Sequence, residues 1–423
     1  MKKALSIALL IVMLSSLSGI STAQVELSMW YHGGAWAAEH QVFIDLIAAF
    51  NEAQSEYTVV LEAFPQESYN SSIVAAAAAG DLPDIIDVDG PVMPGWAWAG
   101  WMAPLELSEG ALDNFLPGPI GEWNGELYAV GLWDAAVSIY ARRSVLEAHD
   151  IRIPTLDEPW SGDEFDAILE QLQATGEFDY AFDPGMAWTG EWYPYAFSPF
   201  LQSFGGDMID RSTYLTAEGA LNGPEAVAFG EWWQSLFERG LSPGTSQDTG
   251  DRETGFIDGR YALQWMGNWA GVSTLGEVGD DLIFLPAPDF GHGNIIGAAS
   301  WQLGASSTTE HPEGVSKFIE FAIQDEWLTA FSDATGLAPA TPNAAAMSEN
   351  YSAGGPLEVF YELSNQQALI RPVTPGYATL ALIFEKALAD IANGADVQDT
   401  LDAAVDEIDA DIEDNMGYGF EDM

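Results

Sequence analysis

The stretch that decides the fold is VELSMWYHGGAWAAEHQVFIDLIAAFNEAQSEYTVVLEAF, residues 25–64. Val25–Tyr31 alternates in the manner of a strand, and the residues from Trp36 to Phe50 place their large apolar side chains on one helical face. Tyr57–Phe64 has strand character again. A strand, a helix and a second strand in this order predict a parallel pair joined by a right-handed crossover.

The same alternation continues for one more unit. A helical run through Ala75–Ala79 leads past Gly80 and Pro83 to a third strand, Asp84–Asp89. The order β-α-β-α-β predicts an α/β fold with a parallel sheet. Ligands of such sheets bind beyond the carboxyl ends of the strands. Here those ends are residues 31–34, 64–66 and 87–89.

The remaining chain is long enough for a second lobe, because 423 residues exceed what one ordinary core holds. Gly223–Gly240 and Pro312–Ile323 have helical periodicity, while Tyr261–Met266 and Asp281–Pro288 have strand character. The last expected helix covers residues 397–415. Its apolar face is formed by Val397, Leu401, Val405, Ile408 and Ile412.

The N-terminal residues have the pattern of a secretory signal peptide, residues 1–23. Lys2 and Lys3 precede an apolar run from Ala4 to Leu14, and small residues precede an expected cleavage after Ala23. The chain has no cysteine, so a thiol-linked lipid anchor has no attachment point. We therefore expect a periplasmic protein that is not a lipoprotein and has no stable membrane insertion, with release into the medium as the alternative.

The charge balance excludes several classes of partner. The sequence has 12 Lys and Arg against 65 Asp and Glu, a formal net charge of −53. Nucleic acids and anionic membrane surfaces would repel such a protein. Its self-repulsion is screened in molar salt, where the Debye length falls to about 3 Å. This composition favours a halophilic host whose brine suits an acidic surface.

Motifs of enzymes are absent from the sequence. It has no GxxxxGK phosphate loop, no GxSxG, no HExxH and no EF-hand loop. The five histidines show no metal-ligand spacing, so neither a metal nor a cofactor is expected. With 65 acidic residues, a pair of carboxylates at the separation used by glycoside hydrolases stays open as an alternative.

Tryptophan placement is the feature that points to a ligand. Several of the 16 tryptophans lie at the ends of expected elements, where they neighbour polar residues. An indole beside a carboxylate or amide suits a sugar, whose C–H face lies on the ring while its hydroxyls bind the polar groups. We expect ligand contacts from Trp133 with Asp134, Trp188 with Glu191, Trp269, and Trp301.

Each of these rings has a structural alternative, because tryptophan is mostly buried in folded proteins. For Trp232 and Trp233, inside a helix, core packing is the favoured reading, and Trp96 and Trp98 fit either role. Arg371 is notable because basic side chains are scarce. It either forms a surface salt bridge or gives a forked hydrogen bond inside a cleft.

Five segments in order resemble one known family. They are AAAAAGDLPDIIDVDG (75–90), NGELYAVGLWDAAVSIYARRSVLEAHDIRIPT (124–155), FGGD (204–207), TGFIDGRYALQWMGNW (254–269) and TGLAPA (335–340). The chain resembles the extracellular solute-binding proteins of sugar ABC transporters, the maltose-binding-like family 1. The segments YARR and IPTLDEPWSGDEF depart from the family pattern, which often has Tyr-Asn-Lys and an adjacent Thr-Trp there, and this leaves the ligand open.

The resemblance implies a two-lobed, type II periplasmic-binding-protein fold. It places residues 24–134 and about 288–340 in an N-terminal lobe, and residues 135–287 and about 341–423 in a C-terminal lobe. The chain would cross between them near residues 133–138, 285–288 and 337–342. A sugar would close between the lobes and the protein, a monomer, would deliver it to the permease subunits without making or breaking a bond.

The resemblance also assigns residues to the cleft. It brings Trp269 there on a loop in which Gly267 allows a sharp turn and Asn268 binds a hydroxyl group. Weaker support falls on His32, Asp89 and Arg371. Three alternatives stay open: the same fold with a polyol, glycerol phosphodiester or oligosaccharide; a secreted glycoside hydrolase; and a sensor or adhesion module. The scarcity of basic residues argues against a phosphorylated ligand.

Overall fold

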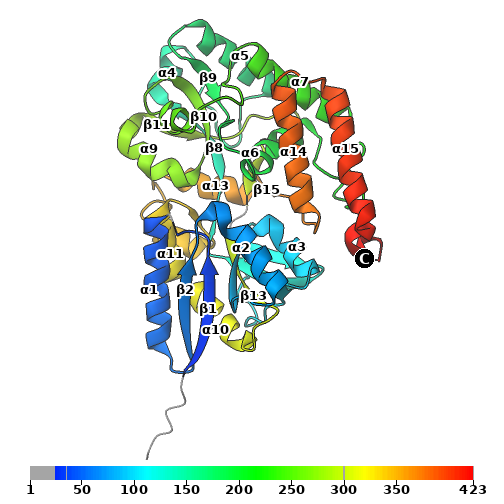
Figure 1. The fold of residues 1–423 in the computed structure, drawn as a ribbon. Helices are drawn as coiled ribbons and strands as arrows, with labels where there is room; N and C mark the ends of the chain where they lie inside the picture. The colour runs from blue at the N-terminus through cyan, green and yellow to red at the C-terminus, as the bar shows by residue number, and fades with distance from the viewer. Residues whose placement is uncertain (1–23, 35, 299–300, 423) are drawn as a thin grey trace, which may run out of the picture.

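The computed structural model describes residues 24–422 except residue 35 and residues 299–300. The expected signal peptide, residues 1–23, lies outside the described residues. Figure 1 shows two α/β lobes, one built mainly from the first third of the chain and one mainly from its middle and its C-terminal helices.

The first lobe is built on a seven-stranded sheet with the order β2-β1-β3-β13-β6-β5, and β4 pairs with β13 beside this path. β1 pairs in parallel with both β2 and β3, which confirms the predicted β-α-β-α-β unit. β13 returns antiparallel between β3 and β6. The strands are β1 (Val25–Tyr31), β2 (Tyr57–Ala63), β3 (Ile85–Asp89), β4 (Met102–Ala103), β5 (Ile120–Trp123), β6 (Glu126–Gly131) and β13 (Trp301–Ser306).

Helices cover this sheet because their apolar faces match it. The apolar face of α1 is buried, and it is formed by Phe43, Leu46, Ile47 and Phe50. These side chains share one core with residues of α10 and α11, which come much later in the chain. The helices are α1 (Ala37–Ala53), α2 (Gln66–Ala79), η1 (Gly90–Val92), α3 (Met93–Trp98), α10 (Pro312–Ala322), α11 (Asp325–Thr335) and α12 (Pro342–Met347).

The second lobe has a four-stranded sheet with the order β11-β8-β10-β9, in which only β10 and β9 run parallel. Its strands are β8 (Val137–Arg142), β9 (Tyr180–Asp183), β10 (Tyr261–Gly267) and β11 (Leu282–Leu285). The predicted helix at residues 223–240 is α7, with Gly223 as its N-cap and Pro224 in its first turn. Trp233 in α7 is fully buried, as expected for a core residue.

Helices surround this second sheet on both faces (Figure 1). The predicted C-terminal helix is confirmed, and all five residues of its apolar face are buried. The helices are α4 (Arg143–Ala148), α5 (Gly162–Ala174), α6 (Trp192–Phe204), α7 (Pro224–Glu238), α8 (Thr249–Thr254), η2 (Asn268–Ala270), α9 (Gly271–Val278), η3 (Gly279–Asp281), α13 (Glu358–Gln366), α14 (Tyr377–Ala392), α15 (Val397–Asp414) and η4 (Met416–Asp422).

Short strands connect the lobes. β7 (Trp133–Asp134) pairs with β14 (Ala338–Pro339), close to two of the expected crossings. The remaining crossing lies later than residues 285–288, because β12 (Ile296–Ala298) still pairs with β15 (Ala368–Ile370) and contacts α6 of the second lobe. β12 therefore belongs to the second lobe and β13 to the first, so the boundary lies later in the chain than the expected residue 288.

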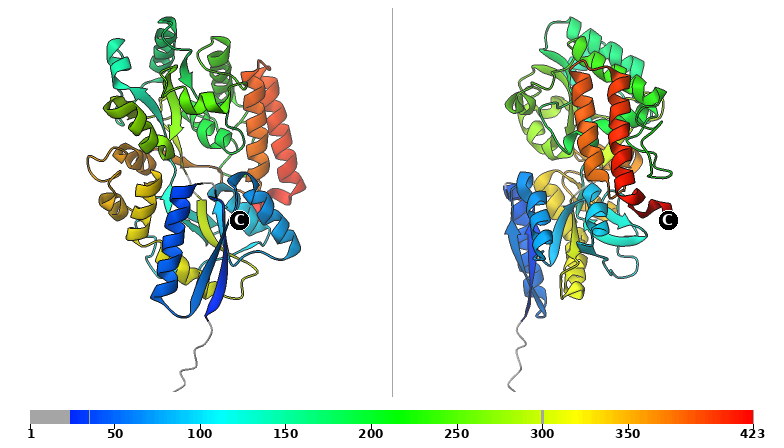
Figure 2. Two further views of the ribbon diagram at one scale, coloured as in Figure 1. Left: turned by 60° about the vertical axis from the view of Figure 1, so that its left-hand side comes forward. Right: turned by 45° about the vertical axis from the view of Figure 1, so that its right-hand side comes forward.

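The C-terminal helices also reach the first lobe. Figure 2 shows α14 and α15 side by side along the second lobe, with their far ends beside the first. A Cβ placed on Gly95 of α3 would lie 3.0 Å from the Pro375 carbonyl oxygen, so the two backbones pass close together. Beyond α15, the Tyr418 ring meets Trp98 of α3 edge to face, with 5.2 Å between centroids.

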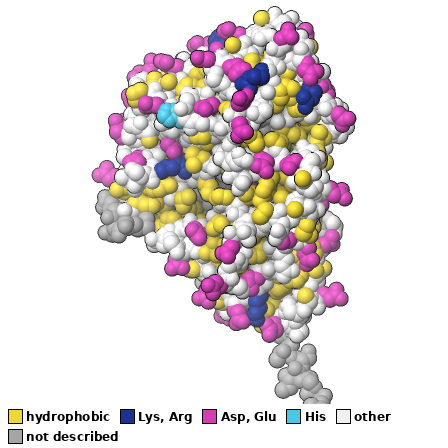
Figure 3. Space-filling view, turned by 180° about the vertical axis from the view of Figure 1, so that it is seen from behind, with side chains coloured by type: hydrophobic (Ala, Val, Ile, Leu, Met, Phe, Trp, Pro, Cys, Tyr) yellow, Lys and Arg dark blue, Asp and Glu magenta, His cyan; other side chains and the backbone are white. Residues whose placement is uncertain are grey.

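The surface carries the acidic excess of the sequence. Figure 3 shows carboxylates scattered over the whole visible face and few basic side chains among them. Within residues 24–34, 36–298 and 301–422, no helix has the length and apolar character needed to cross a membrane.

Candidate ligand-binding site between the lobes

Three strand ends of the first lobe bring predicted site residues together. His32 follows β1, Asp89 ends β3, and Trp301 begins β13 opposite Asp89 in the sheet register. The His32 and Trp301 rings stack with 3.7 Å between centroids and an interplanar angle of 6°. This is the strand-end location that the β-α-β-α-β pattern predicts for a ligand.

His32 is held from behind by Asp87. The imidazole Nδ1 lies 2.5 Å from Asp87 Oδ2, and the backbone N–H of His32 donates to the same oxygen at 3.2 Å. Both side chains are buried. Burial by itself lowers the pKa of His32, but the charge and hydrogen bond of Asp87, with smaller contributions from Glu39 and Asp89, raise it above its ordinary value.

The second lobe contributes a cluster of four aromatic rings, Trp188, Trp192, Tyr195 and Trp269. Trp192 is the central ring, edge to face with Trp188 at 5.0 Å and with Trp269 at 6.1 Å. Tyr195 lies 6.1 Å from Trp269. Trp192 is buried, whereas Trp188 and Trp269 are only partly buried, so these two rings keep surface for a ligand.

Trp269 lies where the two lobes meet, because its ring packs against the cores of both. The expected reason for Gly267 is wrong. Gly267 has an extended backbone with φ −84° and ψ 160°, which any residue adopts. A Cβ at this position would instead lie 2.0 Å from the Trp269 ring. Glycine is required here because the indole of Trp269 lies over its α-carbon.

Asn268 is fully buried and its side chain joins the segments that connect the lobes. Its Oδ1 accepts from the Ala136 N–H at 3.3 Å, and Nδ2 donates to the Asp134 carbonyl at 3.2 Å and to the Tyr351 hydroxyl at 3.1 Å. The amide that was expected to bind a ligand hydroxyl is therefore engaged within the protein. This arrangement favours a structural role for Asn268 over ligand contact.

Trp133 and Asp134 form β7 and are both buried, at 3% and 1% exposure. The Trp133 ring packs on Phe331 at 5.0 Å and on Phe43 at 6.2 Å, inside the first core. The position of the Trp133 ring in this core favours a structural role over the expected ligand contact. Trp133 and Asp134 thus belong to one of the segments that connect the lobes.

A polar group bridges the lobes between the two aromatic sets. Arg371, which follows β15, donates through Nη1 to Glu191 Oε1 in its own lobe. Its Nη2 lies 3.8 Å from Oδ1 of Asp89 in the first lobe, and its guanidinium lies over the Tyr195 ring at 5.1 Å from the centroid. The Tyr377 hydroxyl also donates to Glu191. Arg371 is therefore not the surface salt bridge that was its structural alternative.

The protonation of this polar group is shifted by its surroundings. Burial raises the pKa of Glu191 to about 7; Arg371 opposes this rise, Asp89 adds to it, and the hydrogen bonds from Tyr377 and Arg371 oppose it. Burial also raises the pKa of Asp89, against the charges of Arg371 and His32. Both carboxylates hold their protons at higher pH than exposed carboxylates do.

These contacts link the predicted residues into one set. They run from Trp301 through Asp89, Arg371 and Tyr195 to Trp269, and from Trp269 through Trp192 to Trp188. The set therefore crosses from one lobe to the other. Sequence reasoning missed Asp87, Trp192, Tyr195 and Tyr377. Trp192 directly follows Glu191 and Tyr195 lies four positions after it in GEWYPY, so the aromatic residues that follow a predicted ligand residue were the available signal.

The chemistry available in this set is that of binding. Indole faces, a guanidinium and carboxylates can hold a polyhydroxylated molecule by C–H contacts and hydrogen bonds. Across the part of the chain that the structure describes, no three His, Asp or Glu side chains are grouped so that they could hold a metal ion.

Comparison with known proteins shows the family of this chain. The sequence profile of bacterial extracellular solute-binding proteins matches residues 45–357. The chain belongs to this family. Members of this family bind a solute outside the cytoplasm. This solute-binding protein is therefore an extracytoplasmic binding protein and not an enzyme. The glycoside hydrolase alternative is therefore not favoured.

One curated relative is an uncharacterized lipoprotein encoded in the oleD 5′ region of Streptomyces antibioticus. It is 23% identical over 332 residues, which are 76% of this chain and 72% of the relative. The relative is a lipoprotein by name, whereas the present sequence has no cysteine to carry a thiol-linked lipid.

Solved structures share the two-lobed fold over 92% of this chain. The cyclic alpha-maltosyl-1,6-maltose binding protein of Arthrobacter globiformis superposes with a TM-score of 0.78 at 21% identity, covering all of that chain. The GacH receptor of Streptomyces glaucescens, solved with acarbose, gives 0.75 at 18%, covering 98% of its chain. An ABC substrate-binding protein of Listeria monocytogenes, in complex with cycloalternan, gives 0.74 at 16% and 99% coverage.

Proposed function

We propose that this solute-binding protein captures a sugar between its lobes and delivers it to the permease of an ABC transporter. The observation that carries the proposal is the set of partly buried indoles, Trp301 on one lobe and Trp188 and Trp269 on the other, joined by the interlobe contact of Arg371 with Asp89. A sugar touching both sets favours the closed form by its difference in affinity for the closed and open states.

The proposed residues divide by role. Trp188, Trp269 and Trp301 offer ring faces to the C–H face of the sugar, while Asp89, Glu191 and Arg371 offer charged partners to its hydroxyl groups. The other predicted residues support the site without contacting the sugar. His32 and Gly267 pack against the rings of Trp301 and Trp269, and the connecting segments between the lobes contain or bind Trp133, Asp134 and Asn268.

The named ligands of similar structures support the same class of molecule. The protein of Arthrobacter globiformis is described as a binding protein for a cyclic maltosyl-maltose, the receptor of Streptomyces glaucescens binds acarbose, and the Listeria monocytogenes protein binds cycloalternan. The last is named an ABC substrate-binding protein, which supports a permease partner. We propose that the mature protein is a monomer in the periplasm, released from its signal peptide after Ala23.

A phosphorylated ligand is less well supported than a neutral one. Arg371 is already paired with Glu191 and lies near Asp89, so its charge is balanced within the protein. A phosphodiester at this place would have to displace a carboxylate or face it, and like charges at short distance are unfavourable.

The test is a titration of the purified protein in molar KCl with glucose, maltose, maltotetraose, a cyclic glucan, sorbitol and glycerophosphocholine. Tryptophan fluorescence and calorimetry report binding. We expect a saturable response to at least one sugar, lost in Trp301→Ala and kept in Trp123→Phe, whose indole lies on the edge strand β5. Saturation by sorbitol or the phosphodiester alone would reject the sugar, and a response unaffected by Trp301→Ala would reject the site.

A further inference from the structure

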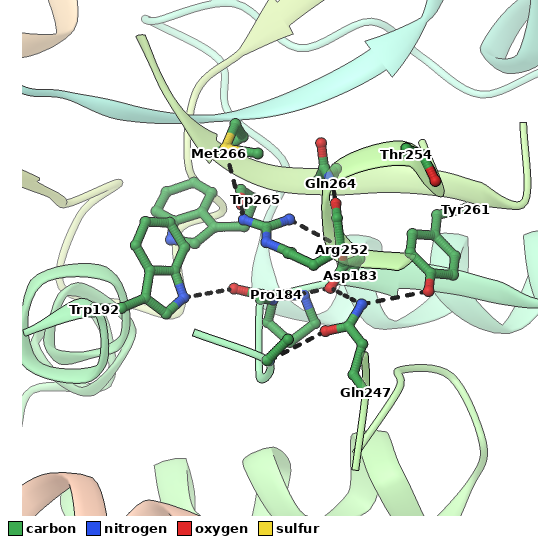
Figure 4. Close-up of polar contacts among 12 residues, drawn as sticks. Asp183, Pro184, Trp192, Gln247, Arg252, Thr254, Tyr261, Gln264, Trp265 and Met266 are labelled. Atoms are coloured by element: carbon green, nitrogen blue, oxygen red, sulfur yellow. Dashed lines mark hydrogen bonds and ion pairs between the residues drawn. The ribbon is translucent and has the colours of Figure 1, made fainter. Parts of the chain in front are cut away.

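A fully buried ion pair lies beneath the aromatic cluster of the second lobe. Arg252 of α8 and Asp183 at the end of β9 have no exposed surface, and Arg252 Nη1 donates to Asp183 Oδ2 at 2.9 Å. Figure 4 shows the guanidinium between Asp183 and the Trp192 ring. Nη2 of Arg252 also donates to the Trp265 carbonyl at 2.5 Å.

The carboxylate of Asp183 is saturated with donors, which fixes the pair in one orientation. Its Oδ2 also accepts from Gln264 at 3.2 Å, and its Oδ1 accepts from Gln247 at 3.1 Å and from the Gly185 N–H at 2.9 Å (Figure 4). Gln264 closes the network by donating to the Arg252 carbonyl at 2.8 Å. A buried charge held by this many bonds is rigid.

The guanidinium lies against two indoles of the aromatic cluster, one of which, Trp188, belongs to the proposed sugar site. Its central carbon lies 4.7 Å from the Trp188 centroid and 5.3 Å from the Trp192 centroid. Trp188 is partly exposed while Arg252 is fully buried, so the ring covers the cation and keeps surface free for a ligand. Trp192 in turn touches Trp269, which extends the support to the third ring.

Stability alone gives a weak reason for such a pair. Replacing a buried ion pair with apolar side chains is often neutral or stabilising, because removing two charges from water is unfavourable. A flat guanidinium fixes the plane of an aromatic ring by cation–π attraction, which an apolar side chain does not do. The contact with the indoles therefore accounts for the pair better than stability does.

The first lobe repeats this arrangement with different residues. There the buried His32 is paired with the buried Asp87, and the His32 ring is stacked on Trp301 with 6° between the planes. Asp87 accepts both from the imidazole and from the backbone N–H of His32, which fixes the ring. Each lobe thus has an indole that lies on a basic side chain, and the basic side chain is anchored by a buried carboxylate.

We propose that Arg252 with Asp183, and His32 with Asp87, are positioning pairs that set the planes of the sugar-facing indoles on the two lobes. The proposal rests on the proposed sugar site, and it adds that the ring planes are fixed before the ligand arrives. A preformed plane reduces the ordering that binding requires and so increases affinity.

Arg252→Lys tests the second-lobe pair, because lysine keeps the charge for Asp183 but has no flat face for Trp188 and Trp192. We expect the affinity for the sugar found by titration to fall about three- to tenfold, and the near-UV circular dichroism of the unliganded protein to change. Arg142→Lys is the matched control, since Arg142 lies over Phe256 at 4.7 Å in the same lobe but outside the site. It should leave the affinity and the indole spectrum unchanged.

A double-mutant cycle with Trp188→Phe separates positioning from general destabilisation. If Arg252 acts through the indoles, the combined loss of affinity is smaller than the sum of the two single losses. Additive losses, or wild-type affinity and spectrum in Arg252→Lys, would overturn the proposal. Should Arg252→Lys fold poorly, the neutral pair Arg252→Met with Asp183→Asn serves in its place.

The spectrum also keeps the two proposals distinguishable. If the wild-type protein binds no sugar, the proposed function fails. A changed near-UV spectrum in Arg252→Lys and in His32→Gln, with none in Arg142→Lys, would still support positioning of the rings. An unchanged spectrum in both would reject it whatever the ligand is.

Discussion

Replacing Glu191 with glutamine should change how the stability of the protein depends on pH. The pKa of Glu191 rises from its usual 4.5 to about 7, mainly because of burial. Between these values the folded protein holds a proton that the unfolded chain has released. The folded state therefore binds more protons, and the contribution of Glu191 to the free energy of unfolding falls as pH rises from 4.5 through 7.

The size of this contribution follows from the pKa difference. One pKa unit corresponds to about 1.4 kcal/mol, so the difference between 4.5 and about 7 gives an upper bound of about 3.5 kcal/mol. The Glu191 side chain is 35% exposed to solvent. Solvent screening then reduces the expected value to about 1–2 kcal/mol.

The assay is urea unfolding followed by far-UV circular dichroism at a series of pH values between about 4.5 and 8, in molar KCl. As pH rises, the free energy of unfolding of the wild-type protein should fall relative to that of Glu191→Gln. Glutamine is chosen because its side-chain oxygen still accepts hydrogen bonds from Arg371 and Tyr377. Glu385→Gln is the control, because Glu385 accepts from the neighbouring Gly190 N–H at 2.9 Å and leaves the Arg371 pair intact. Parallel curves for wild type and Glu191→Gln, or a difference of opposite sign, would refute the reasoning.

Further predictions concern the site, the connection between the lobes and the surface. Trp269→Ala should weaken sugar binding at least about tenfold. It should lower the melting temperature less than Trp265→Ala does, because the indole of Trp265 is fully buried; equal losses of melting temperature in the two variants would make Trp269 a core residue. Asn268→Ala should destabilise the protein by about 2–4 kcal/mol, because it removes the side-chain bonds to the connecting segments; calorimetry showing no change would contradict this. Asp89→Asn should weaken sugar binding about five- to thirtyfold, because it removes the attraction between Asp89 and Arg371 across the lobes. Small-angle scattering should show a larger radius of gyration, and an unchanged radius would show that Asp89 does not hold the lobes together. The melting temperature should rise from about 0.1 M to about 2 M KCl, and a flat curve would reject adaptation to brine.

Local periodicity in the sequence predicts much of the first lobe. The alternation in residues 25–31 and the helical spacing of Phe43, Ile47 and Phe50 depend on neighbours along the chain, so they fix β1 and α1 without tertiary information. The boundary near residue 288 did not follow in this way. β12 is three residues long and pairs with residues 368–370, and such a distant partner leaves no local signal.

The candidate site shows the same division. The strand-end position of His32, Asp89 and Trp301 follows from the rule for parallel sheets. Whether a ring such as Trp133 faces a core or a cleft depends on Phe331, almost two hundred positions later in the chain. The bonds of Asn268 are likewise set by residues 134, 136 and 351. Composition near a residue shows what it can bind, while its partners in the fold determine what it does bind.

The contact of Tyr418 with Trp98 has a practical consequence for handling the protein. The C-terminal segment η4 contacts the first lobe although α15 belongs to the second, whereas β1 begins at the far end of the first lobe (Figure 1). A purification tag or fluorescent reporter fused at the C-terminus would follow η4 and so lie close to this contact between the lobes. Fusion on the N-terminal side of β1 keeps that contact clear. If a sugar closes the lobes as proposed, we expect a dye attached near the exposed Met416 to report the closure.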